Sequence, residues 1–206
     1  MTLWADRVLP FLIEKAGRSH AILAARQRWI PRARGQVLEV GVGSGLNLAL
    51  YDPTRVTRVI ALDPSRALLA RAAPRAAEAR VPVTLVRGDA QALPYADATF
   101  DTIVMTYTLC SIDDPLRALG ELRRVLRGDG ELLFVEHGIS HVERTGRWQR
   151  RLTPYWKRIA GGCHLDRDTG DLLRRSGFTS DDLTAEAIEG ARLLSFTYQG
   201  SAHITR

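Results

Sequence analysis

A short glycine-rich segment is the first feature of this sequence that could do chemistry. It directly follows an apolar run and reads Glu39-Val40-Gly41-Val42-Gly43-Ser44-Gly45. Glycines allow a sharp turn and let a ligand approach the backbone. A dinucleotide-binding loop has its third small residue one position later, where this chain has Leu46. We therefore expect the loop to bind a ligand that lacks a pyrophosphate.

Two aspartates follow later apolar runs. Asp63 ends the second run, where a carboxylate can accept hydrogen bonds from both hydroxyls of a ribose. Asp89 follows Gly88 after the third run and could accept a hydrogen bond from the exocyclic amine of an adenine, with Gly88 leaving room for its ring. Either acid alone could be structural, but acids after successive strands predict a nucleoside site.

The elements that position these residues alternate between short apolar runs and helical stretches. We expect strands at 37–40, 59–62, 83–86, 102–105 and 131–135, with helices at 65–80 and 115–127 between them. Asp114 and Pro115 are expected to start the second of these helices, and Gly128 to Gly130 to end it and turn into the next strand. Such alternation predicts a doubly wound α/β sheet with ligands at the carboxyl ends of its strands.

The ends of the chain complete a single expected domain of residues 1–206. Residues 1–34 are predicted to form a helical cap with two short amphipathic helices, and 35–137 the cofactor-binding half. In 138–206 we expect an acceptor-side insertion, a short helix between Asp168 and Gly177, and a terminal hairpin of 178–185 with 194–204.

Composition narrows the setting. No apolar run approaches the roughly 20 residues that span a bilayer, and the first residues lack the order of a signal peptide. Only two cysteines occur, Cys110 and Cys163, without the paired spacing of a zinc site, so we expect a cytoplasmic protein without a metal centre. The net charge of +6 could attract anions, but it is also common on solvated helix faces, so a nucleic-acid partner is not favoured.

The segments VLEVGVGSG, ALDPS, GDAQALPYADATFDTIV and ELRRVLRGDGELLFVEH, between Gln36 and His137, resemble the ordered motifs of class I methyltransferases that use S-adenosylmethionine. The resemblance implies a Rossmann-like seven-stranded sheet whose last strand is antiparallel. It also implies a cofactor, released as S-adenosylhomocysteine, that lies across the strand ends. The residues implied to touch the cofactor are Glu39, Gly41, Val42, Gly43, Ser44, Gly45, Asp63, Pro64, Ser65, Gly88, Asp89, Ala90, Thr106, Tyr107 and Leu109. For Thr106 and Leu109, ordinary packing is an equal alternative.

A narrower resemblance covers TYTLCSIDDP, FVEHG and PYWKRIAGGCHLDRDT, which are similar to the methyltransferase-like subgroup that includes thiol S-methyltransferases. It implies a small-molecule acceptor, either a thiol or a lipophilic nucleophile. A thiol can react as thiolate, whereas a hydroxyl would need a base. His137, His164 and Tyr107 are the candidates for catalysis, although we favour the interpretation of both histidines as satisfied loop residues. Cys110 and Cys163 are expected to be packed thiols.

Residues 141–160 interleave arginines with aromatic residues. This pattern could bind nucleic acid through phosphate contacts and stacking. We favour an amphipathic segment, bent at Pro154, whose Trp148, Leu152, Tyr155 and Ile159 cover the mouth of the site. It could also contact an anionic membrane surface transiently. Two alternative functions remain, an NAD-dependent oxidoreductase and a non-catalytic module that binds RNA or a protein partner. For the assembly, both a monomer and a homodimer remain open.

Overall fold

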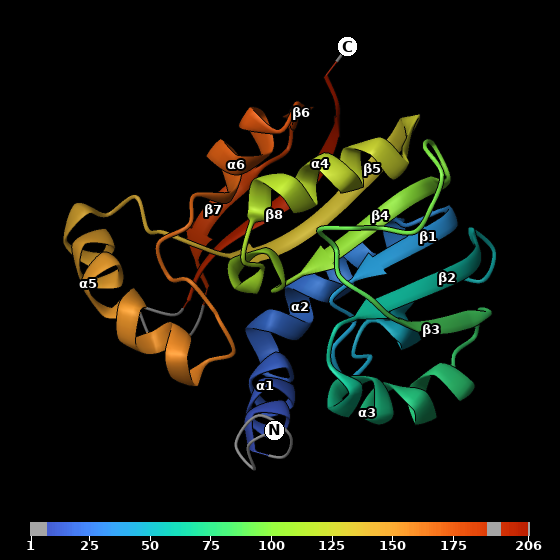
Figure 1. Ribbon diagram of the computed structural model, residues 1–206, viewed down its shortest axis with the longest axis horizontal. Coiled ribbons are helices and arrows are strands. Elements are labelled where there is room, and N and C mark those ends of the chain that lie inside the picture. The colour runs from blue at the N-terminus through green and yellow to red at the C-terminus, as the bar shows by residue number, and fades with distance from the viewer. Residues whose placement is uncertain (1–7, 189–194, 206) are drawn as a thin grey trace.

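A computed structural model describes residues 8–188 and 195–205. Its centre is one twisted sheet in which five strands run parallel in the order β3-β2-β1-β4-β5 (Figure 1). These strands are β1 (Gly35–Val40), β2 (Val56–Asp63), β3 (Val83–Arg87), β4 (Phe100–Thr106) and β5 (Leu126–His137). All five contain the runs predicted from the sequence. Their order places the switch in winding direction between β1 and β4, where an α/β sheet binds its ligands.

The other edge of the sheet is antiparallel. β8 (Phe196–Ile204) pairs antiparallel with β5, and β6 (Phe178–Thr179) and β7 (Thr184–Ala187) both pair antiparallel with β8. Since β5 occupies one side of β8, the two short strands lie one after the other along its outer side. The described sheet therefore has eight strands in seven positions, which keeps the expected arrangement and splits its outermost strand in two.

Helices cover both faces of the sheet, as a doubly wound fold requires. On one face, α2 (His20–Trp29) and α3 (Arg66–Ala77) pack on Val37, Ala61 and Val104. On the other, α4 (Pro115–Val125) and α6 (Thr169–Arg175) pack on Leu38, Ile103 and Phe134. The remaining helices are α1 (Leu9–Gly17), α5 (Glu143–Ile159) and the 3₁₀ turns η2 (Ile30–Arg32), η3 (Leu48–Leu50) and η4 (Leu109–Ser111).

The start of α4 matches its sequence signals, but its end does not. The Asp114 side chain accepts a hydrogen bond from the Arg117 N–H, and Pro115 occupies the first turn. The helix ends at Val125, before Gly128, and the pairing register of β5 with β4 shifts between Leu126 and Glu131. The prediction that Gly128 to Gly130 end the helix was therefore wrong, because Leu126 already pairs with Phe100 and draws the chain into the sheet.

The helix α5 corrects a second prediction. Trp148, Tyr155 and Ile159, which we expected to cover the site, are 49%, 69% and 54% exposed. The buried side of α5 consists instead of Gly146, Gln149 and Thr153. Gln149 attaches the helix, since its amide accepts from the Ser140 N–H at 2.7 Å and donates to the Gly138 carbonyl at 3.0 Å. The helical period was right, but the polar face is the one that packs.

Figure 1 shows α5 at one side of the molecule, beyond the helices that flank the sheet.

The N-terminal residues form α1 and α2 as expected, with Pro10 in the first turn of α1 and Gly17 as its last residue. Within the described residues, no helix is long and apolar enough to cross a membrane.

Candidate functional site

The glycine loop between β1 and η3 lies at the carboxyl ends of the parallel strands. Gly41, Gly43 and Gly45 all have positive φ, a region that favours glycine. A Cβ on Gly41 would lie 2.1 Å from the Thr108 hydroxyl, so this glycine lets the loop after β4 approach. A Cβ on Gly43 would meet nothing closer than 4.0 Å. The loop is thus packed beneath Gly41 and open above Gly43.

Asp63 joins this loop to the one after β2. One carboxylate oxygen accepts from the Gly43 N–H at 2.9 Å and the other from the Ser65 N–H at 2.8 Å. Burial raises the pKa of Asp63, and these two backbone N–H groups oppose the rise. A carboxylate has about four acceptor positions, so about two stay open for ribose hydroxyls. The geometry fits the predicted contact.

The loop after β3 agrees less well with the predicted adenine contact. Asp89 is exposed, and Gln91 donates to it from both its backbone N–H and its side-chain amide at 2.9 and 3.0 Å. The missing Cβ of Gly88 faces Leu62 at 2.7 Å and not an open ligand face. The absence of a Cβ at Gly88 therefore lets this loop pack on β2, and its contact with an adenine ring stays a prediction.

Other predicted cofactor residues build the walls of the loops. Val42 and Ala90 are buried in the two cores, and Leu109 is buried beside α4. Ser44 and Pro64 accept hydrogen bonds through their carbonyls from Arg75 and Arg87, and Ser65 caps α3. Direct cofactor contact by these residues stays a prediction.

Glu39 lies beneath the loop in a buried polar network. It is 1% exposed and accepts from the Asn47 amide at 2.9 Å and the Tyr51 hydroxyl at 2.8 Å. Burial raises the pKa of Glu39 to about 7, while Tyr51, Arg26 and Asn47 oppose the rise. With both oxygens engaged by the chain, Glu39 holds the loop from inside.

Arg26 of α2 completes this network, a role that its place in the sequence does not indicate. Its guanidinium donates to the Asn47 amide oxygen at 2.6 Å and the Thr106 hydroxyl at 2.9 Å, and it lies over the Tyr107 ring at 5.8 Å. The Thr106 hydroxyl is therefore part of the hydrogen-bond network beneath the glycine loop. The sequence places Arg26 at helical spacing from Ile22 and Ile30, but only the fold brings its guanidinium to the sheet.

Tyr107 follows β4 in a left-handed conformation with φ 54°. Such a conformation is rare for a bulky residue and is often found at functional sites. Burial raises the pKa of Tyr107 to about 12, so its phenol stays protonated near neutral pH. Tyr107 is therefore suited to donate a hydrogen bond and unsuited to act as a base.

The two histidines have different surroundings. His164 is partly exposed, and burial lowers its pKa, with the nearby Arg167 charge acting in the same direction. His137 is buried at the end of β5, and its Nδ1 lies 3.8 Å from the Cys163 sulfur. Cys110 belongs to the same group, because ligand atoms of Cys110, His137 and Cys163 lie within 4.8 Å of one another. The expectation of no metal centre rested on spacing along the chain, which does not reveal a cluster that the fold assembles.

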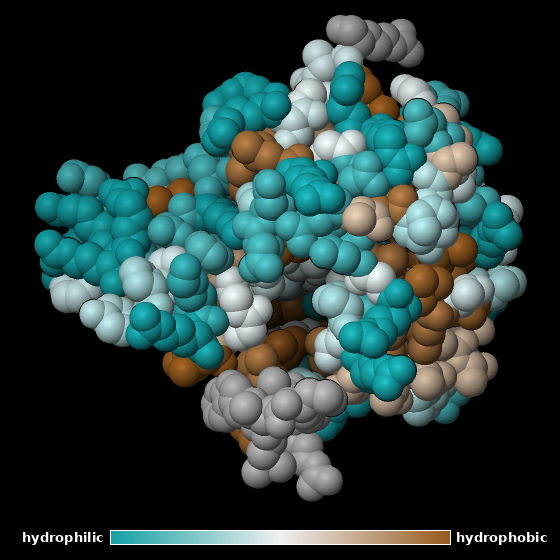
Figure 2. Space-filling model, viewed as in Figure 1, coloured by the Kyte–Doolittle hydropathy of each residue, from teal (hydrophilic) through white to brown (hydrophobic). Residues whose placement is uncertain are grey.

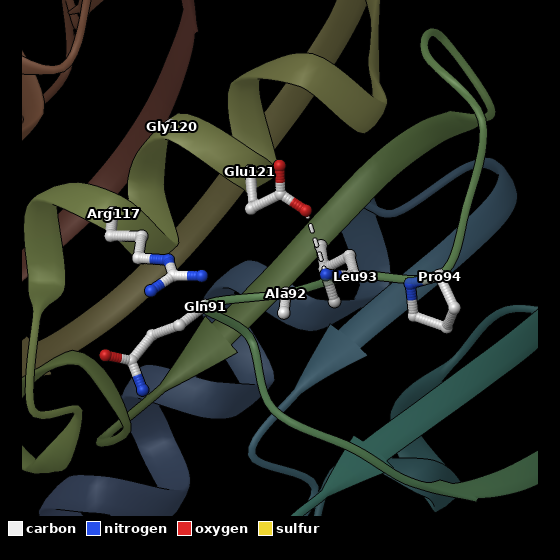
Figure 3. A pocket seen from close by; sticks show the side chains of 7 residues that line it. All are labelled: Gln91, Ala92, Leu93, Pro94, Arg117, Gly120 and Glu121. Atoms are coloured by element: carbon white, nitrogen blue, oxygen red, sulfur yellow. Dashed lines mark hydrogen bonds between the residues drawn. The ribbon is translucent and has the colours of Figure 1, made fainter.

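A hollow in the molecular surface lies where the strand ends converge (Figures 1 and 2). A separate depression of about 520 Å³ lies between α4 and the loop after β3, lined by Gln91, Ala92, Leu93, Pro94, Arg117, Gly120 and Glu121 (Figure 3). There the Glu121 carboxylate accepts from the Leu93 N–H at 2.8 Å and pairs with Arg124, which holds its pKa at about 2. This depression shares no residue with the predicted cofactor site.

Comparisons with known proteins agree with this geometry. Residues 38–134 match the family model described as a methyltransferase domain. The human thiol S-methyltransferase TMT1B is 34% identical over 71% of this chain and 62% of its own length. Phosphatidylethanolamine N-methyltransferase of Cereibacter sphaeroides is 43% identical over 50% of this chain and 51% of its own length. The chain thus spans about three fifths of the length of the thiol S-methyltransferases it matches.

The fold is also found among solved structures. A candidate methyltransferase in complex with the Haloferax volcanii Trm112 methyltransferase activator superposes with a TM-score of 0.75, at 18% identity, over 98% of this chain and 96% of that one. At this identity the likeness shows the fold alone. Together, the family match and the relatives show a methyltransferase domain over residues 38–134 of this chain.

Proposed function

We propose that this chain transfers a methyl group from S-adenosylmethionine to the sulfur of a small-molecule thiol. The observation that carries the proposal is the pair of loops joined by the Asp63 hydrogen bond to Gly43, at the switch in winding direction. S-adenosylmethionine supplies an electrophilic methyl group on a sulfonium. The chain's part is to bind it beside the acceptor.

Cofactor binding is assigned to two parts of the site, the Asp63 carboxylate and the backbone at Gly43. Asp63 keeps open acceptor positions for the ribose, and a Cβ on Gly43 would meet nothing closer than 4.0 Å. The Glu39, Asn47 and Arg26 network below keeps the loop in place. Positioning the acceptor in line with the sulfonium and excluding water then supplies much of the catalysis.

A thiol acceptor suits the residues around Tyr107. Tyr107 stays a neutral phenol, and a thiolate needs no base on the protein. Arg167 brings a positive charge to the ends of β4 and β5, where it donates to the Leu109 carbonyl. The thiol S-methyltransferases match 71% of the chain, a larger share than the 50% matched by the phosphatidylethanolamine enzyme.

Calorimetric titration with S-adenosylmethionine, S-adenosylhomocysteine and NAD tests the cofactor. We expect micromolar binding of both adenosyl ligands and no binding of NAD. A panel of thiol, amine and hydroxyl acceptors with the methyl-labelled cofactor then tests the acceptor. Turnover of amines or hydroxyls without thiols would contradict the thiol assignment, and NAD binding alone would replace it with the oxidoreductase alternative.

A lipophilic acceptor is the second candidate, favoured by the exposed apolar residues of α1 and α5. Phe11 and Leu12 of α1 are 55% and 44% exposed, and Trp148 and Tyr155 of α5 are 49% and 69% exposed among arginines. A basic helix with exposed aromatic residues favours an anionic membrane surface. We expect sedimentation with phosphatidylglycerol vesicles but not with phosphatidylcholine vesicles, and its loss in Trp148→Ser/Tyr155→Ser. Equal binding of this double variant would contradict the surface contact.

A further inference from the structure

Three soft metal ligands meet at the carboxyl ends of β4 and β5. Cys110 lies in η4 after β4, His137 ends β5, and Cys163 follows α5. Their ligand atoms lie within 4.8 Å of one another, and the His137 Nδ1 is 3.8 Å from the Cys163 sulfur. Cys110 and His137 are buried.

The spacing suits a small tetrahedral cation. Zinc binds sulfur at about 2.3 Å and imidazole nitrogen at about 2.0–2.1 Å, which places neighbouring ligand atoms about 3.6–3.8 Å apart in a tetrahedron. The distance of 3.8 Å between the His137 Nδ1 and the Cys163 sulfur is about 0.2 Å longer than the nitrogen-to-sulfur separation of about 3.6 Å in such a tetrahedron. Two thiolates and one imidazole are a ligand set that favours zinc over harder cations such as magnesium.

The loops that carry the two cysteines are held together by other residues. Glu136 accepts from the Thr108 N–H at 2.8 and 3.0 Å, which fixes the turn before Cys110. The Cys110 carbonyl accepts from the His164 N–H at 2.7 Å, which ties the loop of Cys163 to that of Cys110. Arg167 donates to the Leu109 carbonyl beside them. Such surrounding contacts orient metal ligands in known sites.

The cluster also lies beside the cofactor loop, because a Cβ on Gly41 would collide with Thr108, two residues before Cys110. Zinc sites with three protein ligands keep a fourth position for a water molecule or a substrate. We propose that Cys110, His137 and Cys163 bind Zn²⁺ and that the thiol acceptor occupies the fourth position. The acceptor part rests on the proposed function, whereas the metal site stands on the geometry alone.

The reaction balances without any other reagent. The acceptor thiol binds zinc as thiolate and its proton passes to solvent. A sulfur lone pair forms the new bond to the methyl carbon while the bond from that carbon to the sulfonium breaks. The bonding pair stays on the departing sulfur, which gives neutral S-adenosylhomocysteine. The methylated product is a thioether, a weaker ligand than a thiolate, and so it can leave the zinc.

Metal content is the first test. Protein purified under reducing conditions without chelator is analysed for zinc, and cobalt is then exchanged into the site. We expect one zinc per chain, and with cobalt a thiolate charge-transfer band and the visible bands of tetrahedral coordination. Cys110→Ser, Cys163→Ser and His137→Ala should each lose zinc, whereas His164→Gln should keep it. Circular dichroism and calorimetry with S-adenosylhomocysteine establish that each variant is folded.

Three results would overturn the site: wild-type protein without zinc or zinc affinity, zinc retained in all three ligand variants, or a disulfide between Cys110 and Cys163 in the reduced preparation. Methyl transfer tests the acceptor role separately. Chelation should lower thiol methylation and leave S-adenosylhomocysteine binding unchanged, and added zinc should restore it. Thiol methylation by a zinc-free protein would refute the acceptor role of the zinc and keep the proposed function. Zinc binding without thiol methylation would keep the metal site and refute the proposed function.

Discussion

At the scale of single residues, Asp63 has the clearest role. Its carboxylate already orders two loops through Gly43 and Ser65, and its open acceptor positions are assigned to the ribose. We expect Asp63→Ala to weaken S-adenosylhomocysteine binding by roughly 1–3 kcal/mol, because buried hydroxyls lose a charged acceptor. Calorimetric titration measures this loss. Asp52→Ala, in an exposed turn, is the control and should bind normally.

Glu39 makes folding depend on pH. Its pKa in the folded chain is about 7, against an ordinary value of 4.5, because burial disfavours the charged form. Between these values the folded state holds a proton that the unfolded state has released, so this group makes the free energy of unfolding fall as pH rises. The full effect is on the order of 3 kcal/mol.

Glu39→Gln should remove this contribution. Urea unfolding between about pH 5 and pH 8 should show a smaller decline in stability for the variant than for the wild type. Glu78→Gln, which changes an exposed glutamate just after α3, should keep the wild-type slope. An identical slope in Glu39→Gln would show that Glu39 does not titrate in this range.

At the scale of elements, α4 begins with the expected cap, and the Asp114 side chain accepts from the Arg117 N–H at 3.0 Å. Replacing such a cap by alanine costs about 1 kcal/mol, since a backbone N–H in the first turn loses its partner. We expect this loss of unfolding free energy for Asp114→Ala in urea denaturation. Asp113→Ala, one residue earlier and also exposed, should change stability by less than about half as much.

The helix α5 shows why pattern alone misplaced an element. Its aromatic residues recur at helical spacing, and apolar residues are usually the buried ones. Here Gln149 forms two hydrogen bonds to the turn after β5, which no hydrophobic residue could replace. These polar contacts therefore determine which face of α5 packs against the protein. The aromatic face stays exposed, where it could contact a membrane surface.

At the scale of the whole molecule, the two ends of the described chain meet. The Trp29 indole donates to the Gln199 amide oxygen at 3.0 Å, which joins α2 to β8 across the sequence. Trp29 is 2% exposed, and Arg32 lies over its ring. We expect Trp29→Ala to lower the free energy of unfolding by about 3–5 kcal/mol, through the lost packing and the cavity it leaves.

Denaturation followed by far-ultraviolet circular dichroism measures this change. Trp148→Ala provides the matched control, because Trp148 is 49% exposed on α5 and its loss should cost no more than about 0.5 kcal/mol. Comparable losses in the two variants would show that the contact between α2 and β8 adds no stability.

The sequence by itself determined the parallel strands, most helices and the loops of the cofactor site. Apolar periodicity, caps and glycines act between residues close in the chain, so local pattern is enough to assign Gly41, Gly43 and Asp63 to the strand-end loops. Tertiary structure alone decided the rest. Arg26 under the loop and the cluster of Cys110, His137 and Cys163 depend on contacts between distant segments, which local spacing does not record. The exposed aromatic face of α5 has the same cause, because burial is set by what packs against a helix and not by its period.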